Sequence, residues 1–167
     1  MRILIKNGTI LTAENEFKGD LLTEGEKIKA IGDLSGMEAD QVIDAEGKIL
    51  MPGGVDQHTH FSALCNVGDR DTAGYETTQA AIVGGTTTIV DFAPQDPGSG
   101  LLDSIDYRIN VRAKDKACVD FALHGMVTYL MDSVFDEIKY LPEKGVSSIK
   151  IFMAYNLSLI HICWPVL

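Results

Sequence analysis

Two histidines, His58 and His60, stand two residues apart at the end of a short apolar stretch that begins at Gly54. Side chains at positions i and i+2 of a strand project from the same face, so both imidazoles could reach one ion. Imidazole suits zinc and its divalent neighbours, and Asp56 or a backbone carbonyl could fix the ring tautomers. The pair predicts part of a metal site, although an isolated pair with this spacing also occurs in solvent-exposed turns.

Three more polar residues, Asp91, His124 and Lys150, fall near the ends of apolar stretches. Counted with His58, they recur about every 30 residues, the length of one βα unit when a barrel of eight units uses about 250 residues. Such barrels place their chemistry at the carboxyl ends of the strands, so we expect the four side chains at one rim. Taken alone, Lys150 would also fit an edge-strand lysine with its ammonium in water.

Strands alternating with helical stretches indicate a parallel sheet with crossover connections. The expected strands are 54–58, 87–92, 119–125 and 148–153, and the expected helices lie around 77–83, 101–116 and 134–140. The second helix carries one apolar stripe at helical spacing, formed by Leu101, Leu102, Ile105 and Ile109. We therefore interpret residues 52–156 as the first four units of a (β/α)8 barrel, whose open edge needs more chain or a second copy.

Residues 1–51 follow a different pattern, in which short apolar pieces alternate with turn residues. Ile3–Ile5 and Thr9–Leu11 flank Asn7-Gly8, and a Glu24-Gly25 pair follows later. This pattern predicts hairpins in a small all-β unit that ends before Pro52.

Composition limits the class of protein. Apolar residues make up 46% of the chain and charged residues 23%, a globular composition that excludes disorder. The net charge is −10 and there is no Lys/Arg cluster, which disfavours nucleic acid as a partner. The longest nearly apolar run, 157–167, is too short to span a membrane. An odd number of widely spaced cysteines (Cys65, Cys118 and Cys163) favours a reducing compartment, so we expect a cytoplasmic protein.

Three segments resemble barrel strands of the hydantoinase and dihydropyrimidinase family of metal-dependent amidohydrolases. Residues 52–60 (PGGVDQHTH) resemble its first strand, 84–92 (GGTTTIVDF) its second and 148–155 (SIKIFMAY) its fourth, in the same order and spacing. The resemblance covers about residues 1–155. It implies an α/β protein in which part of a small β-sandwich precedes the first half of the barrel.

The resemblance also implies a metal site with two divalent ions, expected to be zinc. His58, His60 and Lys150 match the ligands, and the lysine is carboxylated by carbon dioxide so that it bridges both ions. A cationic ammonium cannot ligate a metal, whereas a neutral amine can add carbon dioxide and become an anionic ligand. Asp91 and His124 match no ligand, and we expect them to hydrogen-bond at the rim or to support the ligands.

Substrate contacts are implied for three further residues. Tyr155 resembles the family's substrate tyrosine, whose phenol donates to the oxyanion that forms at the ring carbonyl. Phe152 and the loop around Leu64 would face the exocyclic group of the substrate. From the residues alone, Tyr155 would equally fit a buried tyrosine with a satisfied hydroxyl, and Phe152 a core aromatic.

The function that the resemblance implies is hydrolytic opening of hydantoin or dihydropyrimidine rings by a hydroxide that bridges two zinc ions, in a homotetramer. An allantoinase-like cyclic amidohydrolase and a non-catalytic, dihydropyrimidinase-related scaffold are the alternatives. The family's two further histidines and its proton-transferring aspartate come from later strands and have no counterpart here. The 167-residue chain is therefore expected to be inactive by itself.

The last residues match nothing in the family. Residues 157–162 (LSLIHI) look like a translated sequencing adapter, so we interpret 157–167 as a foreign tail on a truncated chain. His161 and Cys163 could form a metal pair by spacing, but we interpret them as accidental residues of that tail.

Overall fold

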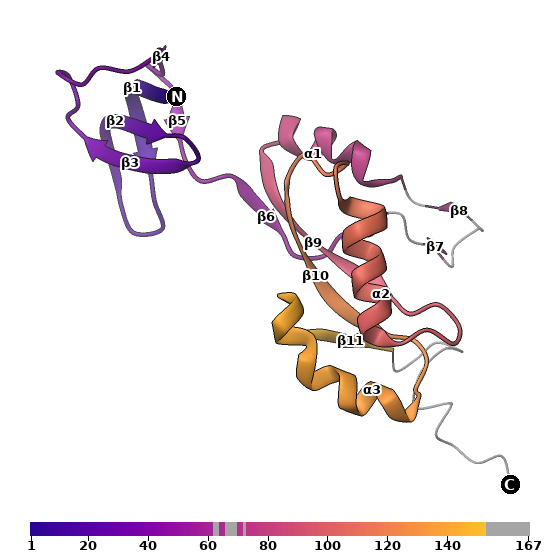
Figure 1. Ribbon diagram of the computed structural model, residues 1–167. Coiled ribbons are helices and arrows are strands. Elements are labelled where there is room, and N and C mark those ends of the chain that lie inside the picture. Colours follow the sequence, from indigo (N-terminus) through magenta and orange to yellow (C-terminus); the bar gives the residue numbers. More distant parts are fainter. Residues whose placement is uncertain (62–63, 66–69, 72, 153–167) are drawn as a thin grey trace, which may run out of the picture. The chain divides into compact units, whose positions relative to one another are not determined.

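The computed structural model describes residues 1–61, 64–65, 70–71 and 73–152. The chain divides into two compact units, Met1–Pro52 and Gly53–Leu167 (Figure 1). Each unit has its own sheet, and each is described by itself.

The first unit is a single five-stranded sheet. Its strands are β1 (Arg2–Leu11), β2 (Glu16–Glu24), β3 (Lys27–Gly32), β4 (Gln41–Asp44) and β5 (Ile49–Leu50). Strands β1, β2 and β3 form an antiparallel meander, whereas β4 and β5 both pair with β1 in parallel. Leu4, Ile10 and Leu22 are buried against one face, as alternation along a half-buried strand requires. The expected β-sandwich portion is confirmed.

The prediction of a turn at Asn7-Gly8 was wrong. Strand β1 runs through this pair, and its register with β2 shifts between Ile5 and Gly8. Asn7 has a φ of 62°, its backbone N–H donates to Asp20 Oδ1, and its amide donates to Asp44 Oδ1. Asparagine tolerates left-handed backbone in a bulge as well as in a turn, so the residue type alone did not distinguish the two. The Glu24-Gly25 pair does join β2 to β3, and Gly25 has a positive φ of 61°.

The second unit contains a four-stranded parallel sheet. Its strands are β6 (Gly54–Asp56), β9 (Thr86–Pro94), β10 (Asp120–Val127) and β11 (Ile149–Ile151), in the order β11-β10-β9-β6. The short strands β7 (Leu64–Cys65) and β8 (Arg70–Asp71) pair separately. The predicted half-barrel is confirmed. Strand β6 ends at Asp56, however, so His58 and His60 follow the strand rather than complete it, because their segment does not continue the pairing with β9.

Helical segments connect these strands, as expected. They are the 3-10 turn η1 (Tyr75–Thr78) with α1 (Gln79–Val83), α2 (Leu101–Tyr107) with the π-helical η2 (Arg108–Ala113), and α3 (Asp132–Glu137) with the 3-10 segment η3 (Ile138–Lys144). Leu101 and Ile105 of the predicted stripe are fully buried, and Leu102 and Ile109 pack against them. No helix in the described part of the chain is both long and apolar enough for a membrane crossing.

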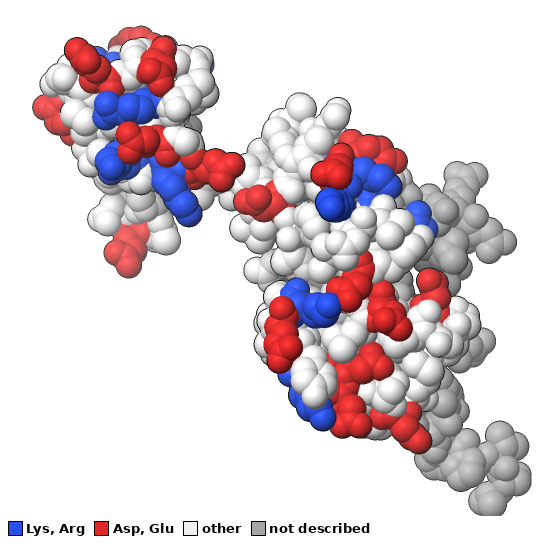
Figure 2. All heavy atoms as spheres, viewed as in Figure 1, with Lys and Arg blue, Asp and Glu red and all other residues white. Residues whose placement is uncertain are grey.

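Charged side chains of both signs share the surface. On the face that Figure 2 shows, lysines and arginines lie among aspartates and glutamates in both units. The exclusion of nucleic acid stays a prediction from composition.

Candidate metal and substrate site

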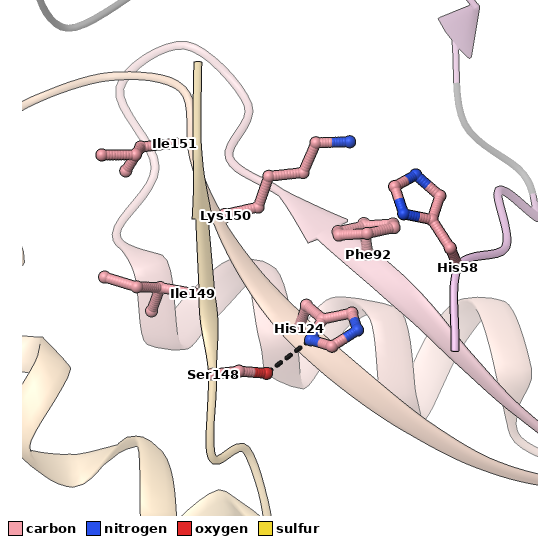
Figure 3. A pocket seen from close by; sticks show the side chains of 7 residues that line it. All are labelled: His58, Phe92, His124, Ser148, Ile149, Lys150 and Ile151. Atoms are coloured by element: carbon pink, nitrogen blue, oxygen red, sulfur yellow. Dashed lines mark hydrogen bonds between the residues drawn. The ribbon is translucent and has the colours of Figure 1, made fainter. Parts of the chain in front are cut away.

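A pocket lies at the carboxyl ends of the parallel strands. The residues that line it come from β9, β10, the β11 segment and the segment after β6: His58, Phe92, His124, Ser148, Ile149, Lys150 and Ile151. The side chains of Lys150 and Ser148 point toward Phe92 and His124, whereas those of Ile149 and Ile151 point away (Figure 3). His58 approaches from the segment after β6, and Lys150 reaches over the pocket from β11. Residues almost 100 positions apart therefore meet because parallel strands end at the same edge.

The predicted histidines and the predicted lysine all surround Phe92. The ring centroids of His58 and His60 lie 4.7 and 4.9 Å from that of Phe92, and 5.2 Å from each other. Lys150 Nζ lies 4.2 Å from the Phe92 centroid. Sequence reasoning did not select Phe92, although an aromatic at the end of β9, directly after Asp91, was the available signal. The structure thus brings the three proposed ligands together over one buried ring.

The described groups around Phe92 are basic, with no carboxylate paired to Lys150 among them. Burial lowers the pKa of the His60 imidazole below its ordinary value, and the charges of Lys150 and His58 lower it further. Neutral imidazole is the form that ligates metals. Among the described residues, no carboxylate pairs with Lys150, and no three His, Cys, Asp or Glu side chains form a metal-binding group. Two imidazoles that can ligate a divalent ion thus lie beside an amine that has no acidic partner in the described part of the chain, which fits part of a metal site.

His124 connects the two sides of the pocket. Its Nε2 lies 3.1 Å from the carbonyl oxygen of Gln57, the residue before His58. Its Nδ1 is hydrogen-bonded to the hydroxyl of Ser148, two residues before Lys150. In the neutral ring, Nε2–H donates to the carbonyl and Nδ1 accepts from the hydroxyl. The expected rim hydrogen bonding of His124 is confirmed.

Asp91 does not face the pocket, so the expected meeting of four polar side chains at one rim was wrong for this residue. Successive side chains of a strand point to opposite faces, and Phe92 occupies the pocket face. Asp91 is instead buried on the other face, where it accepts a hydrogen bond from the Tyr75 hydroxyl. Burial raises the pKa of the Asp91 carboxyl, and the hydrogen bond from Tyr75 opposes that shift.

The substrate residues are only partly described. Phe152 is half-buried, and Lys150 Nζ lies 5.1 Å from its ring centroid. Tyr155, and with it the tail residues His161 and Cys163, lies outside the described residues. Strand β7 contains Leu64, but its side chain is also outside what the structure describes.

The sheet and its pocket define the class of protein. A parallel βα sheet of this kind is the start of a (β/α)8 barrel; His58 and Lys150 line its pocket, and His60 stacks on the Phe92 ring beside them.

Comparisons with known proteins show which sequences this chain is similar to. The chain is 42% identical to a D-hydantoinase of Ralstonia pickettii and 41% identical to a dihydropyrimidinase of Dictyostelium discoideum, over 93% of its own length in both cases. These matches cover 34% and 31% of the two relatives. No family model matches the chain.

Solved structures agree. A D-hydantoinase structure superimposes with a TM-score of 0.86 at 40% identity, and the dihydropyrimidinase of Brevibacillus agri with 0.85 at 39%. Both alignments cover 93% of this chain and 34% of the other. The chain is therefore homologous to one part of the hydantoinase and dihydropyrimidinase family and spans about a third of its relatives' length, which confirms the resemblance.

Proposed function

We propose that this chain supplies one side of the active site of a cyclic amide hydrolase that opens hydantoin or dihydropyrimidine rings. In this reaction a water oxygen bonds to the ring carbonyl carbon, the C–N bond breaks, and the ring nitrogen takes up a proton. The observation that carries the proposal is the convergence of His58, His60 and Lys150 on Phe92. Relatives named D-hydantoinase and dihydropyrimidinase support it.

His58, His60 and Lys150 would hold two divalent ions, which we propose to be zinc. When bound, such ions make a water nucleophilic at neutral pH. The Lys150 amine would form an N–C bond to carbon dioxide and release one proton to solvent, leaving a carbamate with two oxygens for the ions. The absence of an acidic partner for Lys150 among the described residues supports this assignment, because the carbamate would compensate the basic groups around it.

The remaining predicted residues would bind the substrate. Tyr155 would donate a hydrogen bond from its phenolic O–H to the oxyanion at the attacked carbonyl. Phe152, whose ring is near Lys150, would form an apolar wall for the exocyclic group together with Leu64. We further propose a homotetrameric, cytoplasmic protein that binds neither nucleic acid nor membrane, as the family resemblance, the cysteine pattern and the net charge of −10 suggest.

The test is a chimaera in which residues 1–155 are followed by the corresponding remainder of the Ralstonia pickettii D-hydantoinase. Loaded with zinc and bicarbonate, it should hydrolyse hydantoin and dihydrouracil. Lys150→Ala should abolish turnover, and Tyr155→Phe should lower kcat about 100-fold, as removal of an oxyanion donor does. Tyr140→Phe, which alters an exposed tyrosine, is the matched control.

Two results would contradict the proposal. A folded, zinc-loaded chimaera without activity would support the scaffold alternative, and turnover of allantoin alone would support the allantoinase alternative. The 167-residue chain should itself be inactive under the same conditions, because the remaining histidines and the aspartate of the family's site have no counterpart in it.

A further inference from the structure

Buried charged groups hold the backbone directly after His60. The backbone N–H of Phe61 donates to Asp91 Oδ1 at 3.2 Å, and its carbonyl accepts from Arg108 Nη1 at 2.7 Å. The Tyr75 hydroxyl donates to the other Asp91 oxygen at 2.6 Å. Both backbone polar groups of Phe61 are therefore bound by side chains from other elements, β9 and η2.

Burial makes this arrangement costly. Asp91 and Tyr75 are 0% exposed and Arg108 is 4% exposed. Apolar side chains of similar volume often replace buried ionic groups without loss of stability, so stability alone is a weak reason to keep them. Arg108 is also the residue at which α2 gives way to π-helical turns, a feature that is frequent at functional sites.

The segment that these groups hold has few other restraints. Strand β6 ends at Asp56, and after it the described backbone anchors are the hydrogen bonds of the His58, Thr59 and Phe61 N–H groups and of the Gln57 and Phe61 carbonyls. Thr59 donates to the Val90 carbonyl at 3.1 Å, and Phe61 donates to Asp91. His60 thus lies between two residues anchored to β9. The Phe61 N–H belongs to the peptide group that follows His60, so its hydrogen bond restrains the ψ angle of His60.

We propose that Asp91 and Arg108 are positioning residues that orient the His60 imidazole onto the Phe92 ring, beside His58, by holding the backbone of Phe61. They touch neither substrate nor metal, because they lie on the opposite face of the sheet from Phe92. The inference rests on the proposed function for the identity of the ligand, but its central claim, the placement of His60, is a property of the protein without metal.

The stacking of His60 on Phe92 provides a metal-independent measurement. The two rings are inclined by only 18°, with centroids 4.9 Å apart, so the Phe92 ring current shifts the His60 ring protons in an NMR spectrum. His58, which meets Phe92 edge-on at 61°, is an internal reference. In the metal-free 167-residue chain, Asp91→Ala should remove most of the His60 ring-current shift, leave that of His58, and speed exchange of the Phe61 amide proton at least about tenfold.

Zinc affinity, measured by competition with a chromophoric chelator, is the second readout. Asp91→Ala should weaken zinc binding about tenfold, the lower end of the usual loss when a group that supports a ligand is removed. Asp91→Asn should restore affinity to within about threefold, because its amide oxygen still accepts from Phe61. Phe135→Ala, at an exposed phenylalanine of α3, should bind zinc like the wild type.

Controls separate positioning from stability. Leu101 belongs to a hydrophobic core cluster that contains neither Tyr75 nor Phe61. Leu101→Ala should therefore lower the free energy of unfolding without changing the chemical shifts of the His60 ring protons. Should Asp91→Ala fail to fold, Tyr75→Phe removes only one hydroxyl and should shift the same signals in the same direction by a smaller amount. Unchanged His60 signals in either folded variant would overturn the positioning role. Failure of the wild-type chain to bind zinc, with the His60 signals responding as expected, would instead contradict the proposed metal site.

Discussion

The histidine side and the lysine side of the Phe92 ring are held differently. His60 stands on a segment held from behind by the buried groups of Asp91 and Arg108. Lys150 stands on β11, which pairs only with β10 among the described strands, and its neighbours Ile149 and Ile151 are 45% and 52% exposed. Its ammonium contacts only the aromatic faces of Phe92 and Phe152 in the described part of the chain. Buried hydrogen bonds therefore fix the backbone on the histidine side. On the lysine side, the described part of the chain provides only β10 to hold β11 in place.

The largest expected effect concerns the lysine side. With ¹³C-labelled bicarbonate, a protein that carries the complete site should show one carbamate carbon signal, and Lys150→Arg should abolish it, because a guanidinium does not form the stable carbamate. Lys114→Arg, at an exposed lysine, should leave it intact. Retention of the signal in Lys150→Arg would refute carboxylation at this position.

The histidine side is tested by removing its ligands. His58→Ala with His60→Ala should weaken zinc binding by at least about 100-fold, more than the loss of a supporting group, because two ligands disappear. Competition titration measures this loss. His161→Ala should change nothing, since we interpret His161 as part of a foreign tail; a comparable loss there would show that the tail binds metal.

His124, which is hydrogen-bonded to both sides, should contribute less to zinc affinity than the proposed ligands themselves. His124→Ala removes the hydrogen bonds to the Gln57 carbonyl and the Ser148 hydroxyl, so zinc affinity should fall about tenfold. Ser148→Ala breaks only the lysine-side bond and should cost less. Equal losses in the two variants would mean that His124 does not support the histidine side.

The pH dependence of the metal-free chain sharpens the comparison further. The folded-state pKa of His60 lies below its unfolded value, so between the two values the unfolded state binds more protons. Stability should therefore fall as the pH drops below about 6.5 and approaches the folded pKa. In His60→Gln, the fall in the free energy of unfolding that His60 protonation causes should vanish. Urea unfolding at several pH values measures this difference. An identical pH profile in the variant would show that His60 is not desolvated.

The smallest expected effect is the contact between Lys150 and Phe92. Phe92→Leu keeps an apolar side chain but loses the ring face, so the cation–π contribution of about 0.5–1 kcal/mol should disappear. A double-mutant cycle with Lys150→Met isolates this coupling in urea unfolding. A coupling energy of zero would mean that the ring serves the histidines alone.

Much of the fold was predictable because it depends on local patterns. Apolar runs alternating with helical stripes indicated the parallel βα units, and each predicted strand and helix in residues 52–152 has a counterpart. The errors in the predicted strand and turn boundaries lie where pairing between distant segments sets the boundary. Asn7-Gly8 became a bulge because β1 continues along β2, and β6 stopped at Asp56 because its pairing with β9 ends there.

The amino-acid sequence by itself determined the order of the barrel strands, the family resemblance and the identity of His58, His60 and Lys150 as candidate ligands. Only the tertiary structure decided that Phe92 is the ring they share and that Asp91, one residue earlier, supports the opposite face. The physical reason is that side chains alternate along a strand, and which face becomes the pocket depends on register and pairing with strands far away in the sequence.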